Sequence, residues 1–291
     1  MSKNRWMIAG AGIVALAGLA APAFAAWDGL NMTKGVTDLS ARIYHLHMQI
    51  FLVCVAIAVV VFGAMVYALV RYRKSAGAVA DTTFVHSTQF EIIWTFVPVF
   101  ILIAMAVPAA RALIVIEDTR HSELTIKVTG YQWKWHYDYL DRNVNFFSTL
   151  DEKSNFARQP GSGIDPNTVE NYLLEVDHHV KIPVDTKVRI LLTANDVIHA
   201  WWVPALGMKK DAIPGFVNEL WVNAHTLGTY RGQCAELCGR DHGFMPIVVD
   251  VVSKEEFNRW VDSQKSAAPA APAAEGAPAP QAPAAVTPTN S

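Results

Sequence analysis

The sequence has few cysteines and few charged residues. Its 291 residues include three cysteines, 17% charged side chains and a formal net charge of −2. Three cysteines are too few for a disulfide scaffold and cannot all pair. Because the charge is near neutral and no basic recognition motif is present, nothing indicates nucleic-acid binding. The 52% hydrophobic content excludes a disordered chain and exceeds what one soluble core needs, and the length suggests two structural units.

The first 26 residues are predicted to be a signal peptide. Lys3 and Arg5 precede an apolar stretch at 8–19, and the small-x-small motif at 23–25 is typical of a cleavage site after Ala25 or Ala26. A first transmembrane helix is the alternative, which the cleavage motif disfavours. Cleavage places the mature N-terminus outside a bacterial inner membrane.

Two further apolar runs predict a transmembrane helical hairpin over 27–116. Ile50–Val70 and Ile92–Ala110 contain 21 and 19 residues without a charge, enough to span the hydrocarbon core. The predicted spans are about 48–70 and 92–114. Three basic residues within 71–74 place the connection in the cytoplasm by the positive-inside rule. Everything after the second span is then periplasmic.

Residues 117–265 predict an all-β domain. Residues 117–262 carry 21 acidic and 15 basic residues, a local balance of −6. Short apolar segments separated by turn residues indicate an antiparallel sandwich or barrel. The predicted strands are 124–129, 173–177, 188–193, 217–222 and 247–252.

A single helix is predicted to close this domain. Ser253 and Glu256 form a capping box, and Phe257, Trp260 and Val261 share one helical face. The last segment, 266–291, has 17 Ala or Pro among 26 residues and is predicted to be disordered.

One loop collects four soft metal ligands. Cys234, Cys238, His242 and Met245 have the spacing Cys-x3-Cys-x3-His-x2-Met, and two thiolates, an imidazole and a thioether favour copper. A second imidazole is available from His199. The other histidine pairs, 45/47 and 178/179, are expected at surfaces or interfaces.

Three other interpretations of this loop are open. A disulfide suits an oxidising compartment but leaves the histidine and methionine unexplained. A tetrahedral zinc site has no use for methionine. A mononuclear blue-copper site needs only one thiolate. Two thiolates, two histidines and weak donors instead suit two copper ions bridged by sulfur. Cys54, in the middle of a span, is expected to be a small buried apolar residue.

The surrounding motifs resemble subunit II of the haem–copper cytochrome c oxidases. The similarity is carried by DVIHAWWVPALGMKKDAIPG at 196–215, GQCAELCG at 232–239, YQWKWHYDY at 131–139 and EIIWT at 91–95. It extends in order over about residues 40–262. The resemblance implies a cupredoxin fold, a Greek-key β-barrel, carrying a dinuclear CuA centre behind an N-terminal transmembrane hairpin.

The resemblance also implies the ligand set. Cys234 and Cys238 bridge the two coppers, and His199 and His242 are terminal ligands. Met245 is the weak ligand of one copper, and the backbone carbonyl of Glu236 that of the other. The Glu236 side chain matches a ligand of a magnesium ion shared with subunit I.

Four further residues receive roles from the same resemblance. Trp133 corresponds to the electron-entry residue, whereas strand alternation alone predicts core packing for both Trp133 and Trp135. Glu91 corresponds to the mouth of a proton-uptake path. Asp177 and Asp196 stand where the family has acidic residues that dock cytochrome c.

The implied function is electron transfer from cytochrome c, through copper, to the haem of subunit I. Oxygen is reduced to water there with proton pumping. The implied partners are subunit I, which carries haem and CuB, subunit III, cytochrome c and the membrane. No Cys-x-x-Cys-His motif is present, so no haem is expected in this chain. Quinol oxidase subunits lack the copper ligands, and nitrous-oxide reductase lacks the hairpin. A membrane-tethered copper carrier or assembly protein is the alternative from another class.

Overall fold

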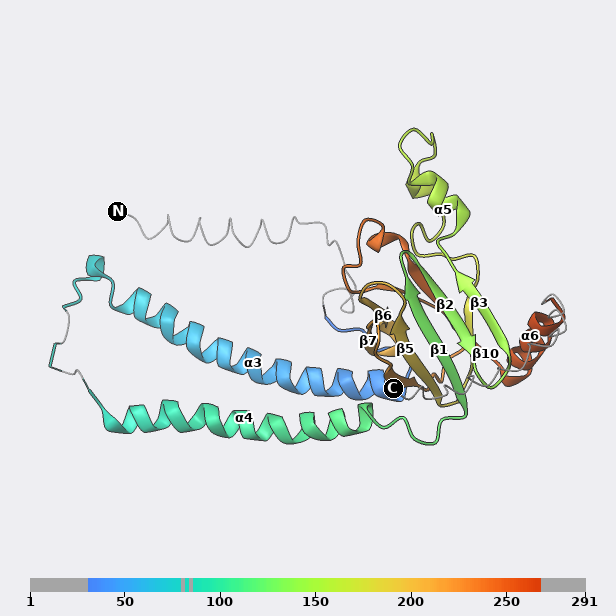
Figure 1. Ribbon diagram of the computed structural model, residues 1–291. Coiled ribbons are helices and arrows are strands. Elements are labelled where there is room, and N and C mark those ends of the chain that lie inside the picture. The colour runs from blue at the N-terminus through green and yellow to red at the C-terminus, as the bar shows by residue number, and fades with distance from the viewer. Residues whose placement is uncertain (1–30, 80–81, 84–85, 268–291) are drawn as a thin grey trace, which may run out of the picture.

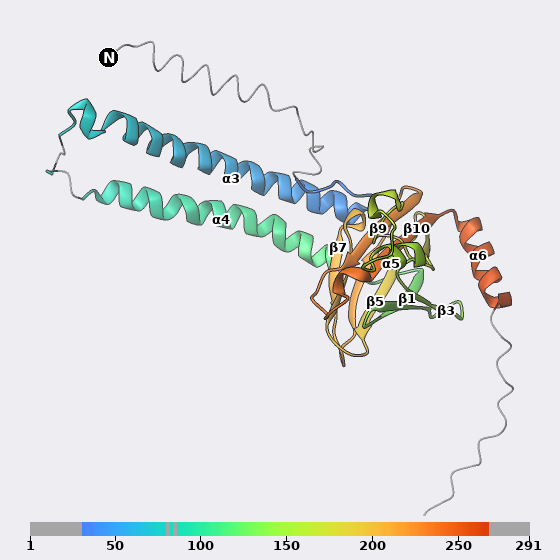
Figure 2. The same ribbon diagram turned by 90° about the horizontal axis from the view of Figure 1, so that it is seen from above.

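The computed structural model describes residues 31–79, 82–83 and 86–267. The predicted signal peptide and residues 268–291 of the predicted tail lie outside this part. A long helical hairpin leads into a β-domain, and a short helix follows the last strand (Figures 1 and 2). Both predicted structural units are therefore present in the described chain.

The hairpin consists of α3 (Asp38–Arg71) and α4 (Thr88–Ile116), which run side by side in both views (Figures 1 and 2). The helices contain 34 and 29 residues, or roughly 50 and 43 Å at 1.5 Å per residue. Both are longer than the predicted spans and enclose each of them completely. A one-turn helix, η1 (Lys74–Ala76), lies in the connection. Length and composition allow both helices to cross a membrane.

The start of α3 is attached to the β-domain. Thr37 caps the helix by accepting from the Ser40 amide at 2.9 Å, while its hydroxyl donates to the Leu206 carbonyl at 3.0 Å. Gly207 has φ +77°, and a Cβ there would lie 2.7 Å from the Ser40 Cα. The close approach therefore requires glycine, and it joins the hairpin to the domain.

Two five-stranded sheets form the β-domain, in the orders β3-β2-β1-β5-β8 and β4-β10-β9-β6-β7. Most neighbouring strands are antiparallel, but β1 with β5 and β4 with β10 are parallel. The strands are β1 (Leu124–Tyr131), β2 (Lys134–Tyr139), β3 (Val144–Ser148), β4 (Val180–Pro183), β5 (Val188–Ala194), β6 (His199–Val203), β7 (Met208–Ala212), β8 (Asn218–Val222), β9 (Gly228–Cys234) and β10 (Pro246–Val252). The all-β prediction is confirmed.

Four of the five predicted strands coincide with β1, β5, β8 and β10, and the fifth is wrong. Residues 173–177 form turns with one isolated bridge, between Leu150 and Val176. Asn171 and Leu173 have φ of 50° and 61°, which is incompatible with an extended strand. The segment belongs to an excursion between β3 and β4 that contains α5 (Glu152–Ala157) and η2 (Pro166–Thr168).

Aromatic side chains fill the space between the sheets. Trp135, Tyr137 and Tyr139 alternate along β2 and are fully buried, as is Trp201 on β6. The Trp201 indole donates to the Tyr137 hydroxyl at 3.3 Å, which satisfies a buried N–H. One more short helix, η3 (Pro204–Leu206), turns the chain from β6 into β7.

The closing helix is α6 (Lys254–Ala267). The Ser253 hydroxyl accepts from the Glu256 amide at 3.1 Å, as the capping box predicts. Phe257 and Val261 are buried against the domain, and Trp260 packs against Tyr139 with ring centroids 5.2 Å apart. The predicted apolar face is confirmed.

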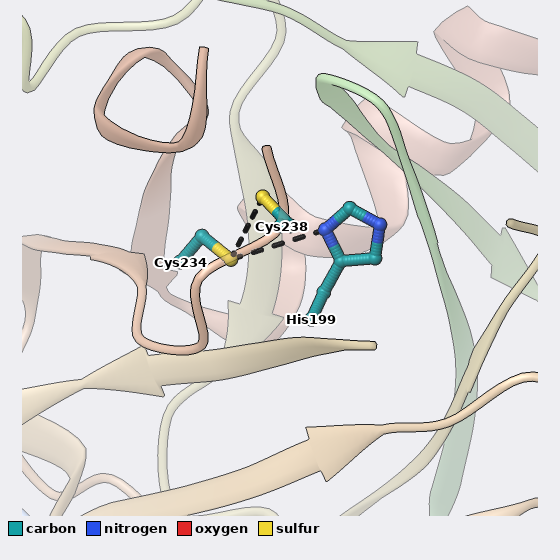
Figure 3. Close-up of side chains that lie close together, drawn as sticks. All are labelled: His199, Cys234 and Cys238. Atoms are coloured by element: carbon teal, nitrogen blue, oxygen red, sulfur yellow. Dashed lines mark hydrogen bonds between the residues drawn. The ribbon is translucent and has the colours of Figure 1, made fainter. Parts of the chain in front are cut away.

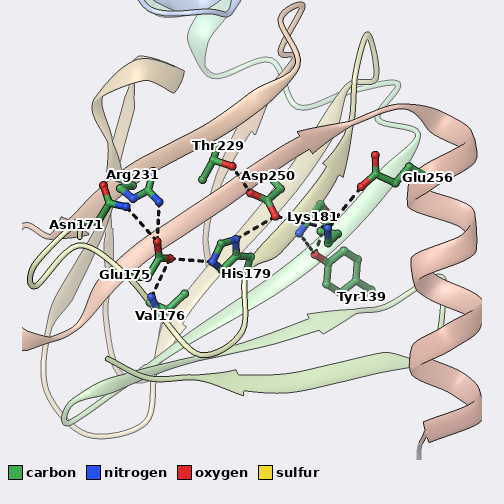
Figure 4. Close-up of polar contacts among 10 residues, drawn as sticks. All are labelled: Tyr139, Asn171, Glu175, Val176, His179, Lys181, Thr229, Arg231, Asp250 and Glu256. Atoms are coloured by element: carbon green, nitrogen blue, oxygen red, sulfur yellow. Dashed lines mark hydrogen bonds and ion pairs between the residues drawn. The ribbon is translucent and has the colours of Figure 1, made fainter. Parts of the chain in front are cut away.

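A polar network holds the excursion against the second sheet (Figure 4). The His179 ring lies between two carboxylates, with Nε2 2.8 Å from Glu175 and Nδ1 3.0 Å from Asp250. Arg231 on β9 donates to Glu175 at 2.6 Å. His179 is thus part of an internal ion cluster, whereas its neighbour His178 is exposed.

Candidate metal centre

Three separate segments meet at one end of the second sheet and bring the soft side chains together. His199 is the first residue of β6 and Cys234 the last of β9. The chain then forms the loop with Cys238 and the short helix η4 (His242–Phe244), and Met245 precedes β10 directly. Because β6 and β9 are paired, with Trp201 opposite Cys234, the histidine and the loop share one edge.

The two cysteines lie at the centre of the site. Cys234 Sγ is 3.8 Å from Cys238 Sγ and 3.9 Å from His199 Nδ1 (Figure 3). Cys238 Sγ is 3.5 Å from His242 Nδ1 and also 3.5 Å from Met245 Sδ. Each sulfur therefore has its own imidazole, and both thiols are free. The ligand atoms of His199, Cys234 and Cys238 lie within 4.8 Å of one another.

The donor set suits a soft metal centre buried from solvent. His199, Cys234, Cys238 and Met245 are 0 to 4% exposed. Burial alone raises the pKa of Cys234, but hydrogen bonds from His199 and the backbone bring it below the ordinary value. Burial and the neighbouring Cys234 raise the pKa of Cys238. Two adjacent buried cysteines ionise together only beside bound positive charge, and this sulfur and imidazole donor set suits copper.

Asp196 orients the histidine on β6. Its carboxylate accepts from His199 Nε2 at 2.9 Å and from the Gln132 amide at 2.8 Å. The other ring nitrogen, Nδ1, then faces Cys234. A Cβ on Gly130 would lie 2.7 Å from His199 Cδ2, so this glycine makes room for the ring. Such outer contacts fix the tautomer and direction of a ligand imidazole.

Trp133 lies in the turn between β1 and β2 and packs against the core only in part, so the core packing predicted for it is half right. Residues 132 and 133 leave the strand, and the Trp133 side chain is half-buried over the cysteine loop. Its indole donates to the Cys238 carbonyl at 3.3 Å. Trp135, inside β2, follows the alternation and is fully buried; its indole donates to the Met245 carbonyl at 3.3 Å.

The remaining candidate residues lie in the cysteine loop, elsewhere on the β-domain and on the hairpin. The Glu236 carbonyl lies 3.3 Å from Cys234 Sγ, and its side chain is exposed. Asp177 accepts from the Thr149 amide at 2.7 Å. Glu91 is in the first turn of α4, at the hairpin end far from the domain, 2.7 Å from His86 (Figure 1). Cys54 is exposed on α3 of this single chain, where no described residue covers it, whereas burial was predicted.

Sequence reasoning did not identify several contacts around the cysteine loop. Gln132 Nε2 donates to the Cys238 carbonyl at 2.8 Å, and Gly239, with φ +119°, would place a Cβ 2.9 Å from that same nitrogen. Arg158 of the excursion lies 3.6 Å from Asp241 and 4.2 Å above the Phe244 ring. These partners are 83 to 107 residues apart in sequence, so local spacing carried no signal for them.

Two family models match the chain, and they define its class. "Cytochrome C oxidase subunit II, transmembrane domain" matches residues 25–111, and "Cytochrome C oxidase subunit II, periplasmic domain" matches 124–252. The chain belongs to the cytochrome c oxidase subunit II family. This confirms the resemblance, the oxidoreductase assignment and a place in a complex of oxidase subunits.

Individual relatives agree with the family models. A "Probable cytochrome c oxidase subunit 2" of Rickettsia prowazekii is 41% identical over 84% of this chain and 74% of its own length. "Cytochrome c oxidase subunit 2" of Branchiostoma floridae is 35% identical over 80% of this chain and 95% of its own length. The solved periplasmic domain of subunit II from Bradyrhizobium japonicum is 42% identical, with a TM-score of 0.44. The matched region covers 51% of this chain and 97% of the chain in that structure.

Proposed function

We propose that the chain accepts electrons from cytochrome c at a dinuclear CuA centre and passes them to the haem of subunit I, where oxygen is reduced to water with proton pumping. One observation carries this proposal: the two buried cysteines lie 3.8 Å apart, each with its own imidazole. Two sulfur-bridged coppers delocalise one electron over both metals, so little reorganises on transfer.

The side chains have distinct tasks in this proposal. Cys234 and Cys238 would hold the copper ions through their thiolates, and His199 and His242 would add one imidazole each. Met245 Sδ and the Glu236 carbonyl are the weak donors, and such donors tune the potential. The exposed Glu236 carboxylate is then available for a magnesium ion shared with subunit I. Burial of the ligands favours a resident centre over a copper carrier, whose ligands must be accessible for exchange.

Trp133 is the proposed electron-entry residue. Its half-buried ring lies over the cysteine loop and is joined to it through the Cys238 carbonyl. We assign cytochrome c docking to the face of the acidic domain that carries this ring, with Asp177 and Asp196 as contacts. Asp196 has a second task, because its carboxylate also holds His199.

The membrane arrangement follows from the charges at the hairpin ends. Arg71, Arg73 and Lys74 lie at the end far from the domain, and the positive-inside rule supports a cytoplasmic position for that end at a bacterial inner membrane. The β-domain is then periplasmic. Glu91, at the cytoplasmic end, is placed to begin proton uptake into subunit I, and subunit III completes the proposed assembly.

Electron paramagnetic resonance of the purified oxidase complex tests the copper assignment. We expect a mixed-valence signal from two equivalent coppers, which Cys234→Ser abolishes and Cys54→Ser leaves intact, because Cys54 is remote on α3. A site that holds one copper, or zinc alone, contradicts the proposal.

A further inference from the structure

A groove lies where the hairpin meets the β-domain. It has a volume of about 640 Å³ and lies between the domain-side ends of α3 and α4, beside Trp221 of β8. Its polar lining includes Arg42 and His45 from α3 and Arg111 from α4. None of these residues contributes to the copper ligands, and the proposed electron path does not use the groove.

The charge of this groove is positive. Its acidic lining residue, Asp38, lies 3.1 Å from His225 Nε2, and His225 also contacts Asp185, so the two lining arginines outnumber the one lining carboxylate. Within residues 31–79, 82–83 and 86–267, neither Arg42 nor Arg111 has a carboxylate within ion-pair distance. Two guanidinium groups on facing helices, without an internal counter-charge, form a site suited to an anionic oxygen ligand.

The groove continues into an apolar one between the same helices. This second groove has a volume of about 400 Å³ and shares Leu46, Gln49 and Pro108 with the first. It extends along α4 to Ile101, seven residues and roughly 10 Å deeper. The rest of its lining is apolar: Ile50, Val53, Ala104 and Met105.

The depth of the two grooves matches the layers of a bilayer. Arg111 directly follows the uncharged run that ends at Ala110, so it lies at the edge of the hydrocarbon core. Trp221, beside it, donates its indole N–H to the Val115 carbonyl at 3.2 Å and lies at the level where interfacial aromatics gather. The cationic groove is therefore at headgroup level, and the apolar groove is below it.

We propose that these two grooves bind one anionic phospholipid. Its phosphate lies between Arg42 and Arg111, and the first part of an acyl chain lies along Leu46, Ala104 and Pro108. A helix of another subunit could fill the apolar groove, but it would leave both guanidinium groups without a counter-charge at the membrane edge. The amphipathic pattern of the lining favours a lipid.

Native mass spectrometry of the intact oxidase complex tests this site. The complex is delipidated and titrated with palmitoyl-oleoyl-phosphatidylglycerol, and in parallel with the matching phosphatidylcholine. We expect the wild-type complex to bind one phosphatidylglycerol molecule. The Arg42→Gln/Arg111→Gln complex should bind it at least about tenfold more weakly. Phosphatidylcholine should bind weakly to the wild-type complex and to the variant complex alike. The control, Arg71→Gln/Arg73→Gln, removes two arginines from the opposite hairpin end and should retain the lipid.

A second variant covers the case in which the double substitution prevents assembly. Ala104→Phe fills the apolar groove and leaves both arginines unchanged, so it should also lose the lipid. Equal retention by wild type and Ala104→Phe would overturn the proposal. Equal loss of lipid in the control variant would also overturn it, because the lipid would then be attracted by charge in general. If the wild-type complex binds no lipid, another subunit covers the groove and the proposal is wrong.

Discussion

At the scale of single residues, the metal ligands are held by side chains that do not bind metal themselves. Asp196 determines which nitrogen of His199 faces the sulfurs, and Gln132 and Trp133 hold the Cys238 carbonyl from above. Gly130 and Gly239 leave the space that these contacts need. The geometry of the centre therefore depends on residues from the β1–β2 turn as much as on the loop that carries the cysteines.

We predict that Asp196→Asn weakens copper binding by about 10- to 100-fold, the usual effect of losing such an outer contact. The amide cannot accept equally well from both His199 Nε2 and the Gln132 amide. Copper competition with a chelator, on the full-length chain in detergent, measures this. Asp177→Asn is the matched control, because that carboxylate contacts Thr149 and no ligand. Equal affinities of the two variants would contradict the orienting role of Asp196.

Four of the proposed ligands could be identified from the sequence because they lie within twelve residues of one loop. The position of Trp133 could not, because strand alternation assumes a continuous strand and the chain turns at 132–133. The contact between Asp196 and His199 could not be predicted from the sequence either. A carboxylate three residues from a histidine is common, and only the start of β6 turns the two side chains toward each other.

At the scale of elements, the junction between α3 and the β-domain depends on a glycine. We predict that Gly207→Ala destabilises the domain by about 1–3 kcal/mol more than Gly215→Ala. Both residues have left-handed backbones, with φ +77° and +79°, so the backbone strain is shared. Only at Gly207 would the new Cβ meet Ser40, whereas Gly215 faces open space. Denaturant unfolding of the full-length chain in detergent measures the difference; equal losses would show that the contact adds nothing.

The His179 cluster predicts a pH-dependent contribution to stability. The hydrogen bond to Asp250 raises the pKa of His179 above its ordinary value, against the opposing effect of burial. The stabilisation is therefore complete below about pH 6.5 and is lost as the pH rises through the folded-state pKa. Burial raises the pKa of Glu175 and Asp250, but their basic partners lower it further, so their contribution is lost at acid pH instead.

We expect His179→Gln to cost about 1 kcal/mol near pH 6 and less near pH 9. Thermal unfolding of the full-length chain at the two pH values, followed by near-ultraviolet circular dichroism, measures this. His178→Gln is the control, since its side chain is 61% exposed and bonds only to the adjacent aspartate. A cost for His179→Gln that stays constant or grows with pH would contradict the assignment.

Periodicity identified the elements that have one apolar face and missed those whose pattern is irregular. Charge-free length marks the two hairpin helices, β5 alternates strictly and α6 has one apolar face, whereas β10 is buried at nearly every position. The excursion between β3 and β4 is held by a partly buried polar cluster and turns through left-handed residues at 171 and 173. Its segment 173–177 combines three apolar and two acidic residues and so resembled a strand, although Glu175 pairs with Arg231 on β9.

At the scale of the whole molecule, charge separates along the long axis. The far end of the hairpin carries Arg71, Arg73 and Lys74, while residues 117–262 have an excess of six acidic groups. Close to the copper ligands, Trp133 and Thr149 line one hollow of about 190 Å³, and Thr149 bonds directly to Asp177. An acidic domain that carries the proposed electron-entry residue is suited to steering a basic redox partner.

We predict that reduction of the intact oxidase by cytochrome c slows as salt rises, because the Debye length falls from about 30 Å at 0.01 M to about 8 Å at physiological ionic strength. Asp177→Asn should lower the rate at low salt severalfold and flatten the salt dependence, since one steering charge beside Trp133 is gone. Glu255→Gln removes an equivalent charge from α6, which packs at the Tyr139 end of β2, opposite the Trp133 turn. It should follow the wild-type curve. Stopped-flow reduction over this salt range distinguishes local docking from net charge: if both variants shift the curve equally, the overall acidity of the domain steers the partner and the assignment of Asp177 is wrong.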